Sequence, residues 1–327
     1  MSKQTIEQVL ASAAQLLRQR RHAELLALAE GVLAQLPGVP LLHVYRGLAL
    51  HELRDFAGAA SSYDRALALG AEGAPLRFNR ANTLGELRRF GEALADYDRA
   101  LELQPGLADA RRNRGILKLL LGDYAGGLPD YEARRPVRPA TAVEGAAAEW
   151  RGEPLAGRSL LVTDATGMGD EIHMVRYLPL LAARGARVCF HGKPALYRLF
   201  DTMADRVEFL REAPDPAAFD FHAKLLSLPF LYGTDAASIP AQVPYLQAEP
   251  ERVRHWGERI GAHGYRIGIA WKGNPSRSID AGRSLPLTGF SELSALPGVR
   301  LISLQKRFGL EELDQLPAGM KVEVLDD

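Results

Sequence analysis

A spacing of 34 residues recurs through the first half of the chain and limits what that half can fold into. Aromatic residues, arginines and small residues all keep this register. The recurring positions are Phe56, Phe90 and Tyr124; Tyr63, Tyr97 and Tyr131; Arg46, Arg80 and Arg114; Gly47, Ala81 and Gly115; Ala59, Ala93 and Gly127; and Ala66 and Ala100. A period of about 20 to 50 residues is typical of repeats that stack side by side, each burying its apolar face against its neighbours.

Each period predicts two antiparallel helices joined by a turn. The small residues at Gly47, Ala59 and their equivalents let the two backbones approach closely, and the ring at Phe56 and its equivalents fills the gap beside the turn. The fourth copy has Arg134 where the middle copies have alanine, so we expect it to cap the stack against the next domain. The expected repeats cover residues 6–39, 40–73, 74–107 and 108–135, within a domain of residues 1–135.

The period and these positions resemble the tetratricopeptide repeat. The resemblance implies a helical solenoid whose first helices line a groove for a protein or peptide partner. Asn79, Asn82 and Asn113 lie on predicted first helices, and because an amide both donates and accepts, such a row can bind a peptide backbone. A similar row occurs in the O-linked N-acetylglucosamine transferases, which this region resembles. Arg77 and Arg111 share a register and would favour an acidic partner, although solvent-facing polar residues explain all five positions equally simply.

Composition excludes several classes of protein. Forty basic side chains balance forty acidic ones, which argues against a protein that coats nucleic acid. Cys189 is the only cysteine, so neither an internal disulfide nor a cysteine-rich zinc site can form, and we expect no metal. The chain shows neither a signal-peptide pattern nor an apolar run of about 18 residues, so we expect a cytoplasmic protein without a membrane span.

The helical period ends at a segment rich in proline, alanine and glycine, which we expect to be a linker over residues 136–156. Trp150 in this segment is expected to pack onto the following domain. Beyond it, short apolar runs alternate with helical segments, which favours parallel α/β architecture. The expected strands are 159–163, 186–191, 207–210, 266–271, 299–304 and 321–325, together with a strand that leads into a loop over 219–229. The expected helices are 171–184, 194–200, 251–262 and 287–296. These predict two Rossmann-like lobes, residues 157–250 and a partial lobe over residues 251–327.

A glycine loop follows the first predicted strand. Gly167 and Gly169 permit close approach of a ligand or of another backbone, and the loop opens a helix. A ligand at the carboxyl end of the strands would meet Asp170, although the same residue could simply cap the helix. The loop lacks the third glycine of the dinucleotide fingerprint. We expect a structural role for His173, one turn further on.

The segment from Gly167 to Leu181 resembles the opening of the heptosyltransferase-like glycosyltransferases, which have the two-lobed GT-B fold. The segments 267–275, 283–293 and 301–306 resemble the start of the nucleotide-sugar lobe in the same group. A bacterial group joins this domain to tetratricopeptide repeats. The resemblance implies α plus α/β architecture, in which the first lobe faces the acceptor and the second binds the donor. It also implies transfer of a sugar, hexosyl or heptosyl, from a nucleotide diphosphate to an acceptor recruited by the repeats, with no other cofactor.

The same resemblance implies roles for individual residues. Asp170 would be the general base that takes the proton of the acceptor hydroxyl. Lys272 and Arg283 would neutralise the departing diphosphate in place of a metal ion. The further donor-binding candidates are Asn274, Ser284, Gln305 and Lys306.

Family members continue past a third strand of the second lobe into a helix that binds the nucleotide phosphates. This sequence stops at Asp327, before that helix, so we expect the second lobe to be incomplete. The alternative function is therefore a tetratricopeptide protein-binding scaffold with a degenerate, non-catalytic glycosyltransferase domain.

Overall fold

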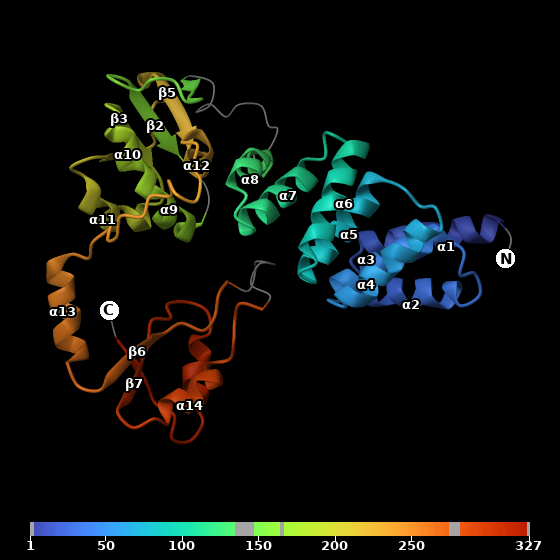
Figure 1. Ribbon diagram of the computed structural model, residues 1–327. Helices are drawn as coiled ribbons and strands as arrows, with labels where there is room; N and C mark the ends of the chain where they lie inside the picture. The colour runs from blue at the N-terminus through green and yellow to red at the C-terminus, as the bar shows by residue number, and fades with distance from the viewer. Residues whose placement is uncertain (1–2, 135–146, 164–166, 275–281, 326–327) are drawn as a thin grey trace. The chain divides into compact units, whose positions relative to one another are not determined.

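The computed structural model describes residues 3–134, 147–163, 167–274 and 282–325. The chain forms two compact units, Met1–Gln247 and Ala248–Asp327. The first contains a stack of helices followed by a five-stranded sheet, and the second contains a three-stranded sheet (Figure 1). None of the described helices combines the length and the apolar character that a membrane span requires.

The 34-residue period corresponds to antiparallel helix pairs, as in tetratricopeptide-like repeats (Figure 1). The first helix of each pair contacts the second, and the second contacts the first helix of the next pair. The pairs are α1 (Lys3–Arg18) with α2 (His22–Leu33), α3 (Pro40–Glu52) with α4 (Phe56–Ala68), α5 (Ala74–Glu86) with α6 (Phe90–Leu103), and α7 (Ala108–Leu120) with α8 (Tyr124–Tyr131).

Glycines allow the close approach of helices within a pair. A Cβ atom on Gly47 would lie 2.5 Å from the ring of Tyr63, and one on Gly115 would lie 2.6 Å from the backbone nitrogen of Tyr131. Real Cβ atoms do not approach other atoms so closely, so Gly47 and Gly115 need to be glycine. The small residues predicted at these positions therefore do bring the paired helices close together.

The turn between the two helices also repeats. The first helices end in a left-handed residue, which is Arg20, Arg54, Arg88 or Gly122, with φ of 57°, 66°, 57° and 85°. At each turn the backbone N–H of that residue and the next one return to carbonyls of the preceding helix, as Arg54 does to His51 and Asp55 to Leu50. This geometry satisfies the last carbonyls of the first helix.

An arginine ladder connects successive repeats. Arg80 of α5 donates from Nε to Asp64 Oδ1 of α4 at 2.7 Å and from Nη1 to Asp96 Oδ2 of α6 at 2.6 Å. Arg46 and Arg114 make the equivalent bonds one period away. Their partners are Glu30 and Ser62 for Arg46, and Asp98 and Asp130 for Arg114. Each arginine therefore joins the second helix of its own repeat to that of the preceding repeat.

The first sheet is entirely parallel, with strand order β1-β5-β2-β3-β4. Its strands are β1 (Ala148–Glu149), β2 (Ser159–Thr163), β3 (Arg187–His191), β4 (Glu208–Phe209) and β5 (Phe221–Lys224). The helices between them include α9 (Met168–Met174), α10 (Leu178–Ala182), α11 (Tyr197–Phe200) and α12 (Leu228–Leu231), with short 3-10 turns at 175–177, 194–196, 201–203, 216–218 and 225–227.

Three details differ from the sequence expectation. In the second unit, the helix expected over 287–296 is a 3-10 helix, Leu287–Phe290, followed by the short α14 (Ser291–Ser294). The helix expected over 171–184 is interrupted by a 3-10 turn between α9 and α10, and Pro179 lies in the first turn of α10. Proline has no backbone N–H and so cannot donate a hydrogen bond to the preceding turn, which favours a break in the helix at this point. The segment expected to be a linker contributes the edge strand β1, and Trp150 beside it is 1% exposed within the core of the sheet, as expected.

The last repeat packs against the α/β part of the first unit, with α8 beside α12 (Figure 1). Arg134 Nη2 donates to Ser227 Oγ at 2.8 Å, and Ser227 Oγ donates to Glu132 Oε2 at 2.8 Å. The guanidinium of Arg134 also lies 4.5 Å from the ring of Tyr131. The departure from alanine at position 134 therefore marks the cap of the stack, as the sequence indicated.

The second unit begins with α13 (Pro250–Ile260) and contains the parallel strands β6 (Tyr265–Ile269), β7 (Val299–Ser303) and β8 (Val322–Val324). Two 3-10 helices, Leu287–Phe290 and Leu310–Gln315, and α14 (Ser291–Ser294) connect them. Five buried residues of this unit form one small core: Ile269, Trp271, Leu287, Leu301 and Met320. The α plus α/β class follows from these elements, whereas the GT-B arrangement of two lobes stays a prediction.

Candidate functional site

One side of the repeat stack is accessible along three first helices. Four positions at helical spacing share this side in α3, α5 and α7, and none of their side chains is buried. We call it the first-helix face; it consists of Leu41, Tyr45, Leu48 and Glu52; Pro75, Asn79, Asn82 and Glu86; and Asp109, Asn113, Ile116 and Leu120. Leu41, Ile116 and Leu120 are 44%, 49% and 69% exposed, so the face has apolar as well as polar surface.

The asparagines of this face bond to one another across repeats. Asn82 Oδ1 accepts hydrogen bonds from Asn113 Nδ2 at 2.9 Å and from the Tyr97 hydroxyl at 2.6 Å. Asn113 Oδ1 accepts from Arg112 Nε at 3.2 Å. The side-chain amide of Asn79 has no hydrogen-bond partner among the residues that the structure describes. The row is thus partly used within the stack, and Asn79 retains its full capacity to bind a ligand.

The two arginines expected in the groove have different environments. Arg77 Nη1 donates to Asp96 Oδ1 at 2.9 Å, and Asp96 is only 3% exposed. Arg111 is exposed and donates to the backbone oxygen of Pro105 at 3.1 Å. Arg77 is therefore held by a buried carboxylate of the ladder, whereas Arg111 remains accessible to solvent.

The first sheet places Asp170 at the carboxyl end of its central strand. The chain leaves β2 through α9 to reach β3 on one side, whereas β5 on the other side comes later in the sequence. Strand order reverses at this point, which is where parallel sheets bind ligands. Asp170 is exposed, and its Oδ2 accepts from the backbone N–H of Gly167 at 3.0 Å. The carboxylate thus caps α9 with one oxygen, and Gly167 and Gly169 flank it on the chain.

Glu171, beside Asp170, was not singled out from the sequence. It is fully buried, and its carboxylate accepts from Lys193 Nζ and from the Lys193 backbone N–H, both at 3.0 Å. A Cβ on Gly192 would lie 2.6 Å from Glu171 Oε2. This pair ties the segment after β2 to the one after β3. Two features of the sequence could have pointed to this ion pair. One is an acidic residue in the first turn of the helix after β2, and the other is the Gly192-Lys193 pair directly after β3.

His173 lies in the last turn of α9. Desolvation lowers the pKa of its imidazole, Arg176 lowers it further, and Asp170 acts in the opposite direction. The ring is therefore neutral at neutral pH. It cannot serve there as a positive partner for Asp170.

The donor-binding candidates of the second unit lie on two segments, Lys272, Asn274, Arg283 and Ser284 after β6 and Gln305 and Lys306 after β7. Several of them bond to the backbone of the segment after β6. Gln305 Oε1 accepts from the backbone N–H groups of Trp271 and Lys272 at 3.0 and 3.2 Å, and its Nε2 donates to the Lys272 carbonyl at 2.8 Å. Ser284 Oγ accepts from the backbone N–H of Gly273 at 2.9 Å. The side chains of Gln305 and Ser284 therefore hold the backbone of the segment after β6 in place.

The two cations proposed for the diphosphate also differ. Lys272 Nζ lies 2.8 Å from Glu312 Oε1 and 3.4 Å from Glu311 Oε1, and the hydrogen bond to Glu312 raises the pKa of the lysine. Arg283 is exposed, with no ion pair or hydrogen bond to any described residue. Asn274 is exposed as well, and residues 275–281 between them lie outside the described ranges.

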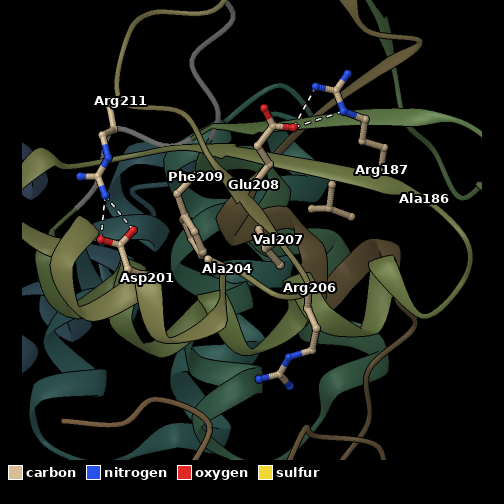
Figure 2. A pocket seen from close by; sticks show the side chains of 10 residues that line it. Ala186, Arg187, Asp201, Ala204, Arg206, Val207, Glu208, Phe209 and Arg211 are labelled. Atoms are coloured by element: carbon tan, nitrogen blue, oxygen red, sulfur yellow. Dashed lines mark hydrogen bonds and ion pairs between the residues drawn. The ribbon is translucent and has the colours of Figure 1, made fainter. Parts of the chain in front are cut away.

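A hollow of about 390 Å³ beside β4 contains none of the predicted residues (Figure 2). Two ion pairs border it, Arg187 with Glu208 at 2.8 Å and Arg211 with Asp201 at 2.7 Å. Arg206 also lines the hollow, and its Nε lies 3.3 Å from Asp205 Oδ1. Because all three arginines have carboxylate partners, we assign no anion to this hollow.

Comparison with known proteins gives partial similarities. No protein-family model matches the chain. The protein FlbA of Caulobacter vibrioides is 28% identical over 197 residues, covering 54% of this chain and 33% of that protein. The chain thus spans about a third of the length of the curated relative it matches.

Among solved structures, YrrB, described as a TPR protein with an unusual peptide-binding site, is 21% identical over 38% of this chain and 64% of that chain, with a TM-score of 0.36. MamA is 15% identical over 40% and 72%, with a TM-score of 0.37. The first TPR domain of Spaghetti (RPAP3), bound to an HSP90 peptide, is 24% identical over 37% and 96%, with a TM-score of 0.35. Values in this range assign the chain to no family.

Proposed function

We propose that the repeats bind an extended segment of a partner protein along the first-helix face. The observation that carries this proposal is the continuous accessibility of that face over α3, α5 and α7, where exposed Leu41, Ile116 and Leu120 accompany the asparagines. Monomeric proteins leave few contiguous apolar patches in water, and larger ones mark binding surfaces.

The chemistry of the face suits a backbone ligand. The amide of Asn79 can donate to a carbonyl and accept from an N–H of the same peptide, without reading its sequence. Ile116 and Leu120 lie one turn apart on α7 and would cover the ligand's apolar side chains. Any preference for acidic segments would come from Arg111, since Arg77 is already paired with Asp96.

A selected peptide tests this proposal. A ligand is first chosen from a random peptide library against the full chain, and its affinity is then measured for Ile116→Asp and for the control Leu103→Asp. Leu103 is 37% exposed but lies on α6, off the first-helix face. Ile116→Asp should weaken binding at least about tenfold, while the control leaves it unchanged. Equal effects of the two variants would contradict docking on this face.

We propose glycosyl transfer as a second candidate function, with a nucleotide-diphosphate sugar as donor and Asp170 as general base. The position of Asp170 supports it, because the exposed carboxylate lies where the strand order of the first sheet reverses. Asp170 Oδ2 is used by the helix cap, whereas Oδ1 has no partner within the described part of the chain and is open to an acceptor hydroxyl. Transfer would take place in the cytoplasm, without a metal ion.

Arg283 is the residue we expect to contribute most to donor binding. Lys272 would have to leave Glu312 to meet a diphosphate, whereas Arg283 has no such competitor among described residues. Titration calorimetry of the full chain with UDP, GDP and ADP should show saturable binding that Arg283→Ala weakens about tenfold.

Asp170→Asn preserves a side chain that can cap α9, so it should abolish sugar transfer while leaving the fold and nucleotide affinity intact. Unchanged turnover would remove Asp170 as the base. No nucleotide binding at millimolar concentration would remove glycosyl transfer altogether and leave a protein-binding scaffold with a silent α/β part.

A further inference from the structure

Two glutamates stand in register at one end of the first-helix face. Glu52 is the last residue of α3, and Glu86, one period on, is the last residue of α5. Both are exposed, and the two helices contact each other. The carboxyl end of a helix carries partial negative charge, which makes it an unfavourable place for an acidic side chain. The stability of α3 and α5 therefore accounts for neither glutamate.

No described cation holds these two carboxylates. Glu86 forms no hydrogen bond or ion pair with any described residue, and Glu52 has one distant contact, in which His22 Nε2 lies 4.0 Å from its Oε2. His51 Nδ1 lies 2.8 Å from Thr83 Oγ1. Burial lowers the pKa of the His51 imidazole more than the two glutamates raise it, so this ring is uncharged at neutral pH.

The arginines nearby in the sequence do not pair with the glutamates either. Arg54 and Arg88 come two residues after them, a spacing at which side chains of a helix do not face each other. The guanidinium carbon of Arg54 lies 5.3 Å from the ring centre of Phe56. Arg18 takes the same register position in α1, but within the described repeats it forms no ion pair with Glu52. This end of the face thus presents two carboxylates without a cationic partner.

A buried hydroxyl without a partner lies beneath the same part of the face. Tyr63 is 0% exposed, and its hydroxyl has no hydrogen-bond partner among the described residues. One period on, the Tyr97 hydroxyl donates to Asn82 of the face, but the equivalent of Asn82 beside Tyr63 is Leu48, which cannot accept. Burial raises the pKa of the Tyr63 hydroxyl and the charge of Glu52 adds to this, so that carboxylate is close by. Buried polar groups are normally hydrogen-bonded, and this one lacks a group that a ligand can supply.

The row that contains the two glutamates ends in an apolar residue. Leu120 follows Glu86 by one period, lies on α7 and is 69% exposed. Ile116, one turn before it, is 49% exposed. The third acidic residue of the face, Asp109, lies at the other end of α7 and is paired with Arg112 at 3.1 Å. The row therefore changes from acidic on α3 and α5 to apolar on α7.

We infer that the first-helix face selects a partner segment that carries basic residues at a fixed spacing from a bulky apolar residue. The inference rests on the docking proposed above and adds the chemistry of the docked segment. Contacting helices lie about 10 Å apart, and an extended chain advances about 3.3 Å per residue. A lysine or arginine at Glu86 would thus lie about three residues from the side chain that covers Leu120, and one at Glu52 about six residues from it.

The charges of the face favour a cation at this end. An ammonium or guanidinium group forms charge-assisted hydrogen bonds with Glu52 and Glu86, and an N–H of the same group would give the Tyr63 hydroxyl the partner that it lacks. An acidic side chain would instead be repelled. Arg111, the accessible arginine of α7, lies near the start of that helix, so any acidic residue of the partner belongs at the opposite end of the face.

Parallel selections from a random peptide library test the inference. One selection uses the wild-type chain, and the other uses the double variant Glu52→Lys, Glu86→Lys. The wild type should enrich lysine or arginine about three or six residues from a leucine, isoleucine or phenylalanine, and the double variant should lose this preference. Lysine is favourable at the carboxyl end of a helix, so the variant should keep its fold and its thermal midpoint. Wild-type sequences without basic residues, or with acidic ones in their place, would overturn the inference.

A charge exchange tests the pairing directly. An enriched peptide is made again with each basic residue replaced in turn by glutamate. Glu86→Lys should weaken binding of the original peptide at least about tenfold and should strengthen binding of one of the glutamate peptides. The control Glu102→Lys makes the same change of charge on α6, off the face, where the side chain is 65% exposed, and should alter neither affinity. Equal effects of the two variants would overturn the inference.

The inference and the docking that it rests on can fail separately. If Ile116→Asp weakens peptide binding but the enriched peptides show no basic preference, docking on the face stands and the inference is wrong. If Ile116→Asp leaves the affinity unchanged, the docking itself is wrong and the inference falls with it. A library that yields no enriched peptide removes both.

Discussion

The repeats and the second α/β unit bury their apolar residues to different extents. Tyr63 and Leu84 in the repeats are fully buried, because each helix pair packs on neighbours at both sides. In the second unit Val253, Leu304 and Leu296 remain more than half exposed, because a three-stranded sheet with one small core has little to pack against them. The repeats therefore bury the positions that recur in every copy and leave apolar surface on the first-helix face, whereas the second unit leaves apolar surface around its single small core.

The largest effect that would sharpen this comparison comes from the arginine ladder. Asp96→Ala leaves Arg77 and Arg80 without their buried partner, and should lower the free energy of unfolding by about 3 to 5 kcal/mol. Glu72→Ala removes a surface partner of Arg99 and should cost less than about 1 kcal/mol. Urea denaturation followed by circular dichroism measures both. Equal losses would show that the ladder does not stabilise the stack.

Close packing within a helix pair gives the next effect. Gly115→Ala would drive a methyl group into the backbone of Tyr131 and should cost about 1 to 3 kcal/mol. Gly85→Ala is the matched control, since α5 leaves open space there and alanine favours helix by up to about 1 kcal/mol. The thermal midpoints of the two variants should move in opposite directions. Movement in the same direction would contradict the tight approach of α7 and α8.

The left-handed turns predict a gain in stability. Arg88 has a φ of 57°, which glycine adopts without strain, so Arg88→Gly should raise the free energy of unfolding by about 0.5 kcal/mol. Arg65→Gly, on the exposed side of α4, should lower it by about 1 kcal/mol. Chemical denaturation of both variants provides the measurement, and a loss in Arg88→Gly would argue against the repeated turn.

A smaller effect concerns the first sheet at low pH. The backbone N–H and the hydroxyl of Ser159 donate to Asp220 and lower the pKa of its carboxyl from 3.8 to about 2. Because the pKa is lower in the folded state, the ionised carboxylate of Asp220 stabilises the fold fully at pH values above 3.8. This contribution disappears as the pH falls toward 2. The difference between the urea midpoints of wild type and Asp220→Asn should therefore shrink over that interval. A constant difference would mean that Asp220 does not hold β5 to β2.

The sequence predicted the repeats more completely than the sites. The period places helices, turns and small residues, because every copy must satisfy the same packing. The acidic partners of the ladder also follow the period, since Asp64 and Asp98 are 34 residues apart, as are Asp96 and Asp130. Which arginine bonds to which aspartate, however, can be seen only once the helices are placed beside one another.

The contacts of the α/β part could not be predicted in this way. Glu171 meets Lys193 at a separation of 22 residues, and Lys272 meets Glu312 at a separation of 40. Neither pair recurs, and both depend on which loops the strand register brings together. Asp170 was expected after β2, but its bond to Gly167 depends on the local helix start.

Photochemical cross-linking tests the central claim, that the first-helix face is where a partner binds. A benzophenone side chain replaces Ile116 in one variant and Leu103 in another, and the selected peptide is added before irradiation. The account predicts peptide adducts from position 116 and none from position 103. Adducts from position 103 alone, or adducts from neither position with a peptide that binds tightly, would contradict it.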